Sequence, residues 1–178
     1  MSVLHSDLQP AVRVEPRDFP LKLTLKQRLT FLVWTQTVIL IRHAERGAGA
    51  DPVLTADGQA RAALLVQMLQ DAGLAAVYVT ATLRSQQTGT PVAQAAGVPL
   101  TPYDAADAVA LVTAIRAAQS AGPVLVVAHS NTVDDIAAAL GAPGVAELTD
   151  GQFDRMYIIT RSWCGTRLLR LRYGNPTP

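Results

Sequence analysis

Three apolar runs of the sequence each lead toward a cationic or titratable side chain. The runs are Val38–Ile41, Val77–Val79 and Val124–Val127, and the side chains that follow them are Arg42, His43, Arg84 and His129. If the runs form neighbouring parallel strands, all four side chains meet at one carboxyl edge, where open α/β sheets bind ligands. The sequence shows no obvious carboxylate partner for this group. We therefore expect it to bind an anion, and a phosphoryl group is the natural candidate.

The elements that position these side chains can be read from hydrophobic periodicity and from residues that begin or end helices. The first core strand is expected at Thr37–Ile41, apolar on both faces. Helices are expected at about 56–71, 84–96, 104–120 and 131–140, with Thr55, Asp104 or Asp107 as N-caps and Gly73, Gly97 and Gly141 at the ends. Residues 98–101 are strand-like, and 155–160 with 166–172 alternate as a hairpin does.

Alternating helices and strands followed by a hairpin predict a three-layer α/β/α sandwich, with a mostly parallel sheet and a C-terminal antiparallel hairpin. We expect one domain over residues 37–178. Three prolines break the preceding segment 1–36, which we interpret as a poorly ordered arm or a mis-called translation start. Its alternating stretch Leu21–Lys26 is the alternative, as a short edge strand that packs on the domain or on a partner.

Composition narrows the function classes. The 178 residues are 49% hydrophobic and 16% charged, as in a globular protein, and the net charge of +1 gives no reason to expect nucleic acid or a membrane surface as partner. Cys164 is the single cysteine, so an internal disulfide and a cysteine metal cluster are excluded. No membrane span or secretory signal is evident, and a cytoplasmic location is expected.

Four motifs in order resemble those of the histidine phosphatase superfamily, whose fold is phosphoglycerate-mutase-like. The resemblance covers residues 37 to about 174. The segment Arg42-His43-Ala44-Glu45 resembles the family's Arg-His-Gly/Ala-Glu signature, and Leu54-Thr-x-x-Gly58-x-x-Arg61-Ala62 resembles its entry to the first helix. The segment from Thr82 through Arg84 to Thr88 is similar to Ser-x-x-x-Arg-x-x-Gln-Thr. Val126-Val-Ala-His129-Ser-Asn-Thr132 resembles the second histidine motif of a small bacterial phosphatase subgroup.

The resemblance implies a role for each matching residue. His43 would be the nucleophile and form a phosphohistidine, while Arg42, Arg84 and His129 would bind the phosphoryl oxygens. A neutral imidazole can attack phosphorus while a backbone carbonyl holds its other nitrogen. Backbone N–H groups at the start of the following helix would add partial positive charge. Neither a metal nor another cofactor is expected, because the cationic side chains supply the charge.

The general acid is harder to place. Larger family members use a Glu, or an Asp directly after the second His, where this chain has Ser130. Asp104 and Asp107 lie between Arg84 and His129, in the interval where the first of these family patterns places its acid. Asp104 is favoured over Asp107 because Tyr103-Asp104 resembles a Tyr-Asp pair of the small subgroup. Further candidates for an acid or a supporting role are Glu45, Asp134, Ser130, Asn131 and Thr132. A weak acid would favour substrates with a good leaving group, such as an acyl phosphate or a phosphoramidate.

The sequence thus predicts a metal-independent phosphatase for a small phosphomonoester or a phosphohistidine on a protein. A phosphoglycerate mutase is less favoured, because the loop from Arg46 to Pro52 is short and lacks the mutases' Ser and Asn. Two alternative functions belong to other classes. One is a phosphate-binding regulatory module without a working acid, and the other is a hydrolytic metal site built on His43 and His129. The physiological substrate and the oligomeric state are left open.

Overall fold

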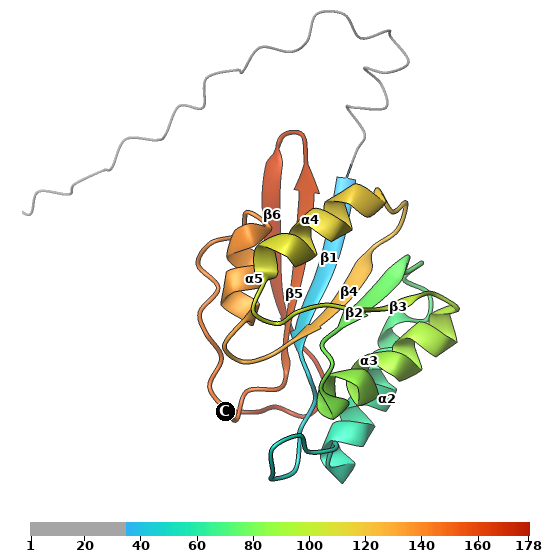
Figure 1. Ribbon diagram of the computed structural model, residues 1–178, viewed down its shortest axis with the longest axis vertical. Coiled ribbons are helices and arrows are strands. Elements are labelled where there is room, and N and C mark those ends of the chain that lie inside the picture. Colours follow the sequence, from blue (N-terminus) through green and yellow to red (C-terminus); the bar gives the residue numbers. More distant parts are fainter. Residues whose placement is uncertain (1–34) are drawn as a thin grey trace, which may run out of the picture. The chain divides into compact units, whose positions relative to one another are not determined.

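The computed structural model describes residues 35–178, and within them six strands form one mixed sheet (Figure 1). The strands are β1 (Thr35–Arg42), β2 (Ala76–Val79), β3 (Leu100–Pro102), β4 (Val124–Ala128), β5 (Arg155–Ser162) and β6 (Gly165–Arg172). Their order is β3-β2-β4-β1-β5-β6. The first four strands in this order run parallel, and β5 and β6 pair antiparallel beyond β1. The predicted mostly parallel sheet with a C-terminal hairpin is confirmed.

Helices cover both faces of the sheet, as predicted for three layers. They are α2 (Ala56–Leu69), α3 (Leu83–Ala96), α4 (Ala108–Ala118) and α5 (Val133–Ala139). Val38 and Leu40 of β1 face one core with α4 and α5, and Ile39 and Ile41 face the other with α2 and α3. A strand buried on both faces reads as a continuous apolar run, which is why the sequence located β1.

Local residues fix several element ends. The Thr55 hydroxyl accepts the Gly58 N–H at 3.2 Å, so Thr55 is the N-cap of α2 as predicted. Gly97 ends α3 with φ of 64°, a conformation that glycine adopts without strain. Of the two predicted caps for α4, Asp107 is the N-cap, and its carboxylate accepts the Ala110 N–H at 2.7 Å.

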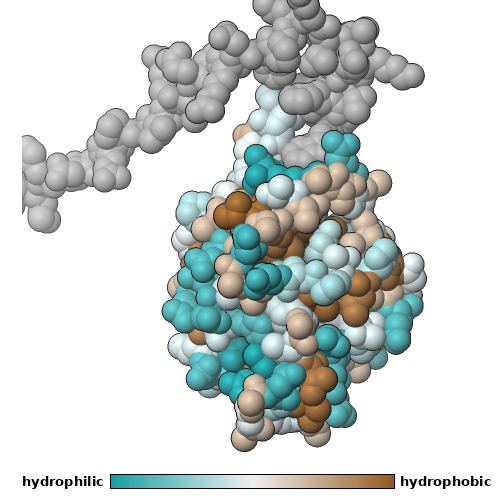
Figure 2. All heavy atoms as spheres, viewed as in Figure 1, coloured by the Kyte–Doolittle hydropathy of each residue, from teal (hydrophilic) through white to brown (hydrophobic). Residues whose placement is uncertain are grey.

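Strand β1 begins at Thr35, two residues before the expected start, because Thr35 and Gln36 pair with Ser162 and Arg161 of β5. The predicted arm is otherwise outside the described residues, as is the possible strand at 21–26. Among the described residues, no helix combines the length and apolar character needed to span a bilayer. On the face seen in Figure 2, hydrophobic side chains are interspersed among hydrophilic ones.

Candidate active site

His43 is held rigidly just beyond the end of β1. Its backbone N–H donates to the Ala128 carbonyl of β4 at 2.9 Å, and the Ala44 N–H donates to the Thr88 hydroxyl at 3.0 Å. The residue is 2% exposed, and its Nδ1 lies 2.8 Å from the Ala44 carbonyl. Since a carbonyl only accepts, Nδ1 must carry the proton. The neutral ring then presents an unprotonated Nε2, which is the nucleophilic form of histidine.

Arg42 is also buried, and it is fixed by the chain that leads into β5. Its Nη1 donates to the carbonyls of Thr149, Asp150 and Gln152 at 2.7, 2.9 and 3.2 Å. The guanidinium lies 4.1 Å from the ring centroid of Phe153, whose ring is 6.0 Å from that of His43. Burial lowers the pKa of Arg42 to about 10, which leaves the group charged at neutral pH.

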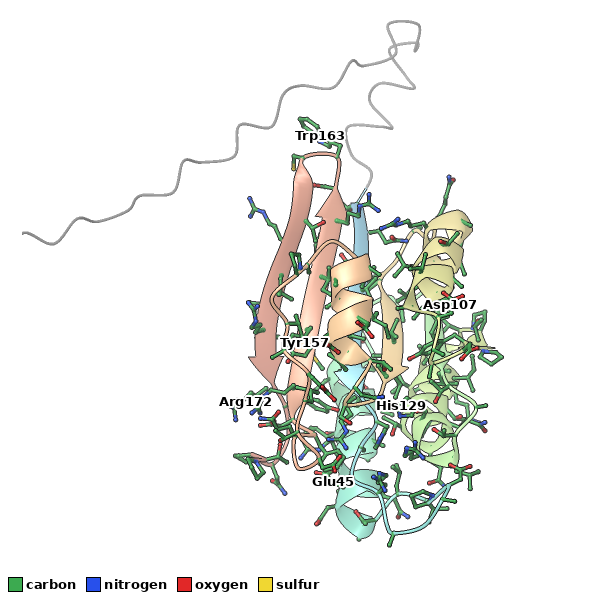
Figure 3. All side chains as sticks on the ribbon, turned by 60° about the vertical axis from the view of Figure 1, so that its left-hand side comes forward. Glu45, Asp107, His129, Tyr157, Trp163 and Arg172 are labelled. Carbon is green, nitrogen blue, oxygen red and sulfur yellow. The ribbon has the colours of Figure 1, made fainter. Side chains whose placement is uncertain are left out.

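His129 follows β4 and faces His43, with 5.3 Å between the two ring centroids. Its Nε2 lies 2.9 Å from the hydroxyl of Thr80, at the end of β2. The Thr132 hydroxyl accepts the His129 backbone N–H at 3.1 Å. Because β2, β4 and β1 are adjacent and parallel, the predicted meeting of Arg42, His43 and His129 at one sheet edge is confirmed. Figure 3 shows His129 and Glu45 toward the end of the sheet opposite Trp163.

Arg84 lies in the first turn of α3, beside this edge. Contrary to the expectation that the arginines lack carboxylate partners, each has one. Arg84 Nη1 lies 3.5 Å from Asp51 Oδ1, and Arg42 Nη2 lies 3.7 Å from Asp150 Oδ1. Both aspartates belong to loops that are distant in sequence from the arginines, so sequence spacing did not reveal the pairs.

Both site histidines have lowered pKa values. Burial is the main cause, and the positive charges of Arg42 and Arg84 add to it. The pKa of His43 falls from 6.5 to about 3, and that of His129 from 6.5 to about 4. A lowered histidine pKa means that the neutral ring persists as the pH falls, so both rings are neutral at physiological pH.

This neutrality can be measured by NMR. We expect the ring signals of His43 and His129 to show no titration step between about pH 8 and about pH 5, and His43 to be the tautomer protonated on Nδ1. In the urea-unfolded chain the same histidines should titrate near 6.5. Because only the unfolded chain then gains these protons, the free energy of unfolding should decrease as the pH falls below about 6.5. A step near 6.5 in the signals of His43 or His129 in the folded protein would contradict the conclusion that these two rings are neutral.

The two favoured acids are exposed and take part in turns. Asp104 accepts the Ala106 N–H at 2.9 Å, and Asp107 caps α4. Tyr103 donates its N–H to the Val79 carbonyl at 2.9 Å and its hydroxyl to the Val127 carbonyl at 3.2 Å. These two bonds place Asp104 next to the carboxyl ends of β2 and β4. Asp104 is thus the better placed of the two candidates, although local backbone already binds its carboxylate.

Glu45 is engaged by a different partner. Both of its carboxylate oxygens accept from Arg61 of α2, at 2.7 to 3.0 Å. The alternative reading of Glu45 as an acid is therefore less favoured than a supporting role. Ser130 accepts the Leu148 N–H through its backbone carbonyl, and Asn131 is exposed. The amides of Thr132 and Val133 donate to the His129 carbonyl, so they close the turn into α5 and are not free to bind an anion.

Several site residues were missed at the sequence level. In the family motif Ser-x-x-x-Arg, the first residue lies four positions before the arginine. Counted back from Arg84, this position is Thr80 and not Thr82. The motif could therefore have identified Thr80, the hydrogen-bond partner of His129, as a site residue. Phe153 carried no comparable signal, because it is an isolated aromatic residue in a loop. In the described part of the chain, no group of three or more His, Cys, Asp or Glu side chains is arranged to hold a metal ion.

Comparisons with known proteins agree with this geometry. Residues 38–107 match the family described as the histidine phosphatase superfamily (branch 1). The match includes Arg42, His43 and Arg84 and ends before His129, which the fold brings beside His43. A search of curated protein sequences gives no match.

Solved bacterial structures share the fold at low sequence identity. A mycobacterial glucosyl-3-phosphoglycerate phosphatase is 14% identical with a TM-score of 0.66, covering 79% of this chain and all of its own. A putative phosphohistidine phosphatase SixA from Nakamurella multipartitia is 21% identical with a TM-score of 0.57, covering 80% of this chain and 98% of its own. A putative alpha-ribazole-5'-P phosphatase from Escherichia coli is 17% identical with a TM-score of 0.61, covering 79% of this chain and 99% of its own. Residues 38–107 thus resemble the histidine phosphatase superfamily, and the described part of the chain shares the fold of these structures.

Proposed function

We propose that this protein is a metal-independent phosphatase that works through a phosphohistidine on His43. The observation that carries the proposal is the state of the His43 ring. It is buried, neutral and bound at Nδ1 to the Ala44 carbonyl, so the lone pair of Nε2 is available for attack on phosphorus. A charged imidazolium would have no such lone pair.

The reaction has two steps. In the first, Nε2 of His43 forms a bond to phosphorus as the bond to the leaving group breaks. In the second, water attacks the phosphohistidine and releases inorganic phosphate and the free imidazole. Arg42, Arg84 and His129 would bind the phosphoryl oxygens and stabilise the charge that spreads over them. The carbonyls that hold Nη1 of Arg42 fix the direction of its guanidinium before the substrate binds.

The substrate class follows from the general acid. Asp104 would protonate the leaving oxygen, and its exposed carboxylate is also bound by a backbone N–H. A site with such an acid favours leaving groups that depart with little help, so a phosphohistidine or another phosphoramidate is preferred to an alkyl phosphate. The likeness to a putative phosphohistidine phosphatase supports the same class. Small aryl phosphates would be substrates for the same reason.

The function is tested by measuring hydrolysis of an aryl phosphate and a phosphoramidate with and without EDTA. We expect turnover of both to be unaffected by the chelator, because the charged Arg42 and Arg84 take the place of a metal ion at the phosphoryl oxygens. Rapid acid-free quenching should trap a phosphate that is labile in acid and stable in base, and mass spectrometry should locate it on His43.

Other outcomes would favour the rival functions. Phosphate binding without turnover of either substrate would favour a regulatory phosphate-binding module. Activity lost with EDTA and restored by a divalent metal would favour the hydrolytic metal site. Transfer of the phosphoryl group to a phosphoglycerate in preference to water would favour a mutase.

A further inference from the structure

The two arginines of the site are paired with aspartates that are far more exposed than they are. The side chains of Arg84 and Arg42 are 18% and 2% exposed, whereas those of Asp51 and Asp150 are 48% and 93% exposed. The ion pairs are also long, at 3.5 and 3.7 Å. Ion pairs of this length whose carboxylate is exposed to solvent contribute little to stability. A ligand with more negative charge can therefore replace either carboxylate at its arginine.

Asp51 differs from Asp150 in having a second partner. Its two carboxylate oxygens lie 3.0 and 3.3 Å from the Leu83 backbone nitrogen, which donates to them at the start of α3. Thr82, the N-cap of this helix, makes no side-chain capping bond. Asp51 thus satisfies a helix N-terminus and a site arginine together, which is the role an anion takes at such a position.

We propose that Asp51 is a resident counter-anion that competes with the phosphoryl group for Arg84 and sets how strongly the site holds anions. This inference rests on the proposed function, in which Arg84 binds phosphoryl oxygens. Asp51 lies against Nη1 of Arg84 at 3.5 Å, and its negative charge repels a phosphoryl group bound to the same guanidinium. Asp51 therefore weakens the binding of product phosphate and promotes its release.

The same charge affects substrate choice. Repulsion from Asp51 grows with the charge of the ligand, so a pyrophosphate is opposed more than an orthophosphate. A phosphoryl group on a neutral leaving group meets the least repulsion. Asp51 is thus a specificity-determining residue that favours singly phosphorylated substrates over polyanions.

The test is the variant Asp51→Asn. The asparagine amide oxygen still accepts the Leu83 N–H, so the cap of α3 stays while the negative charge is removed. Asp71→Asn is the matched control, because Asp71 is exposed in the turn after α2, at the end of that helix remote from the site. It changes the net charge by the same amount. Calorimetry would give the Kd of inorganic phosphate and of pyrophosphate for both variants and the wild type, at low and high salt.

We expect Asp51→Asn to bind phosphate about three- to tenfold more tightly than the wild type, with a larger gain for pyrophosphate. The gain should shrink in about 0.5 M salt, where the charges are screened. Asp71→Asn should stay within about twofold of the wild type. A purely structural role of Asp51 predicts weaker binding, not tighter binding.

Two results would count against the proposal in different ways. If the wild type binds phosphate and Asp51→Asn binds it equally or more weakly, the counter-anion is excluded and the phosphatase function stands. If neither protein binds phosphate, the proposed function is contradicted, and the inference with it.

Discussion

Replacing His43 with alanine is expected to reduce kcat on aryl phosphates by about 10⁴-fold or more, because the proposed nucleophile is removed. No described side chain takes the place of Nε2, since the neighbouring His129 is bound through its own Nε2 to Thr80. The measurement is steady-state hydrolysis, with quenched-flow trapping of acid-labile phosphate. The variant should show no trapped phosphate.

A second variant, His129→Ala, distinguishes loss of the proposed nucleophile from loss of a group that stabilises the phosphoryl charge. His129→Ala should lower kcat less, by about 10²- to 10³-fold, because it removes a donor to the phosphoryl oxygens and leaves the nucleophile in place. His43→Ala should still bind inorganic phosphate, since Arg42 and Arg84 are unchanged. Equal losses in the two variants, or substantial turnover by His43→Ala, would contradict the assigned nucleophile.

Features set by neighbouring residues could be predicted from the sequence. The Thr55 cap, the Gly97 helix end and the hairpin around Trp163 each depend on a few consecutive residues, and the structure has all three. The meeting of Arg42, His43 and His129 could also be predicted, because parallel strands in one sheet place their carboxyl ends together. These predictions required only local patterns and one rule of topology.

The partners of the site residues could not be predicted in the same way. Arg42 is held by carbonyls more than a hundred positions away, and backbone carbonyls carry no sequence signature. The expectation that the arginines lack carboxylates was wrong because Asp51 and Asp150 lie in irregular loops. Exposed aspartates are common in loops, and their positions in the sequence do not indicate which arginine they approach in the fold. Such contacts depend on how separate loops pack.

One buried contact of this kind links the loop after His43 to the segment that follows β6. Arg61 of α2 binds Glu45, two residues after His43, and also donates to the carbonyls of Tyr173 and Asn175 at 2.5 and 2.8 Å. The arginine side chain is 3% exposed and the carboxylate 18%. Gly58 lets the helix approach closely, because a Cβ there would lie 2.1 Å from the Glu45 carbonyl oxygen.

Arg61→Met is therefore expected to destabilise the protein by about 3–5 kcal/mol, because it leaves a partly buried carboxylate and two carbonyls without their donor. The melting temperature should fall by about 10 °C, measured by calorimetry or circular dichroism. Arg167→Met, an exposed arginine of β6, is the matched control and should change the free energy of unfolding by less than about 0.5 kcal/mol.

The Glu45 partner gives an independent check on the cause. Glu45→Gln keeps an acceptor for Arg61 and should cost less than Arg61→Met. If the two side chains act as a pair, the double variant should be less destabilised than the sum of the single variants by about 1 kcal/mol or more. Additive losses would mean that Arg61 stabilises the fold through the two carbonyls alone. The Arg61–Glu45 pair would then have no part in holding the loop that carries His43.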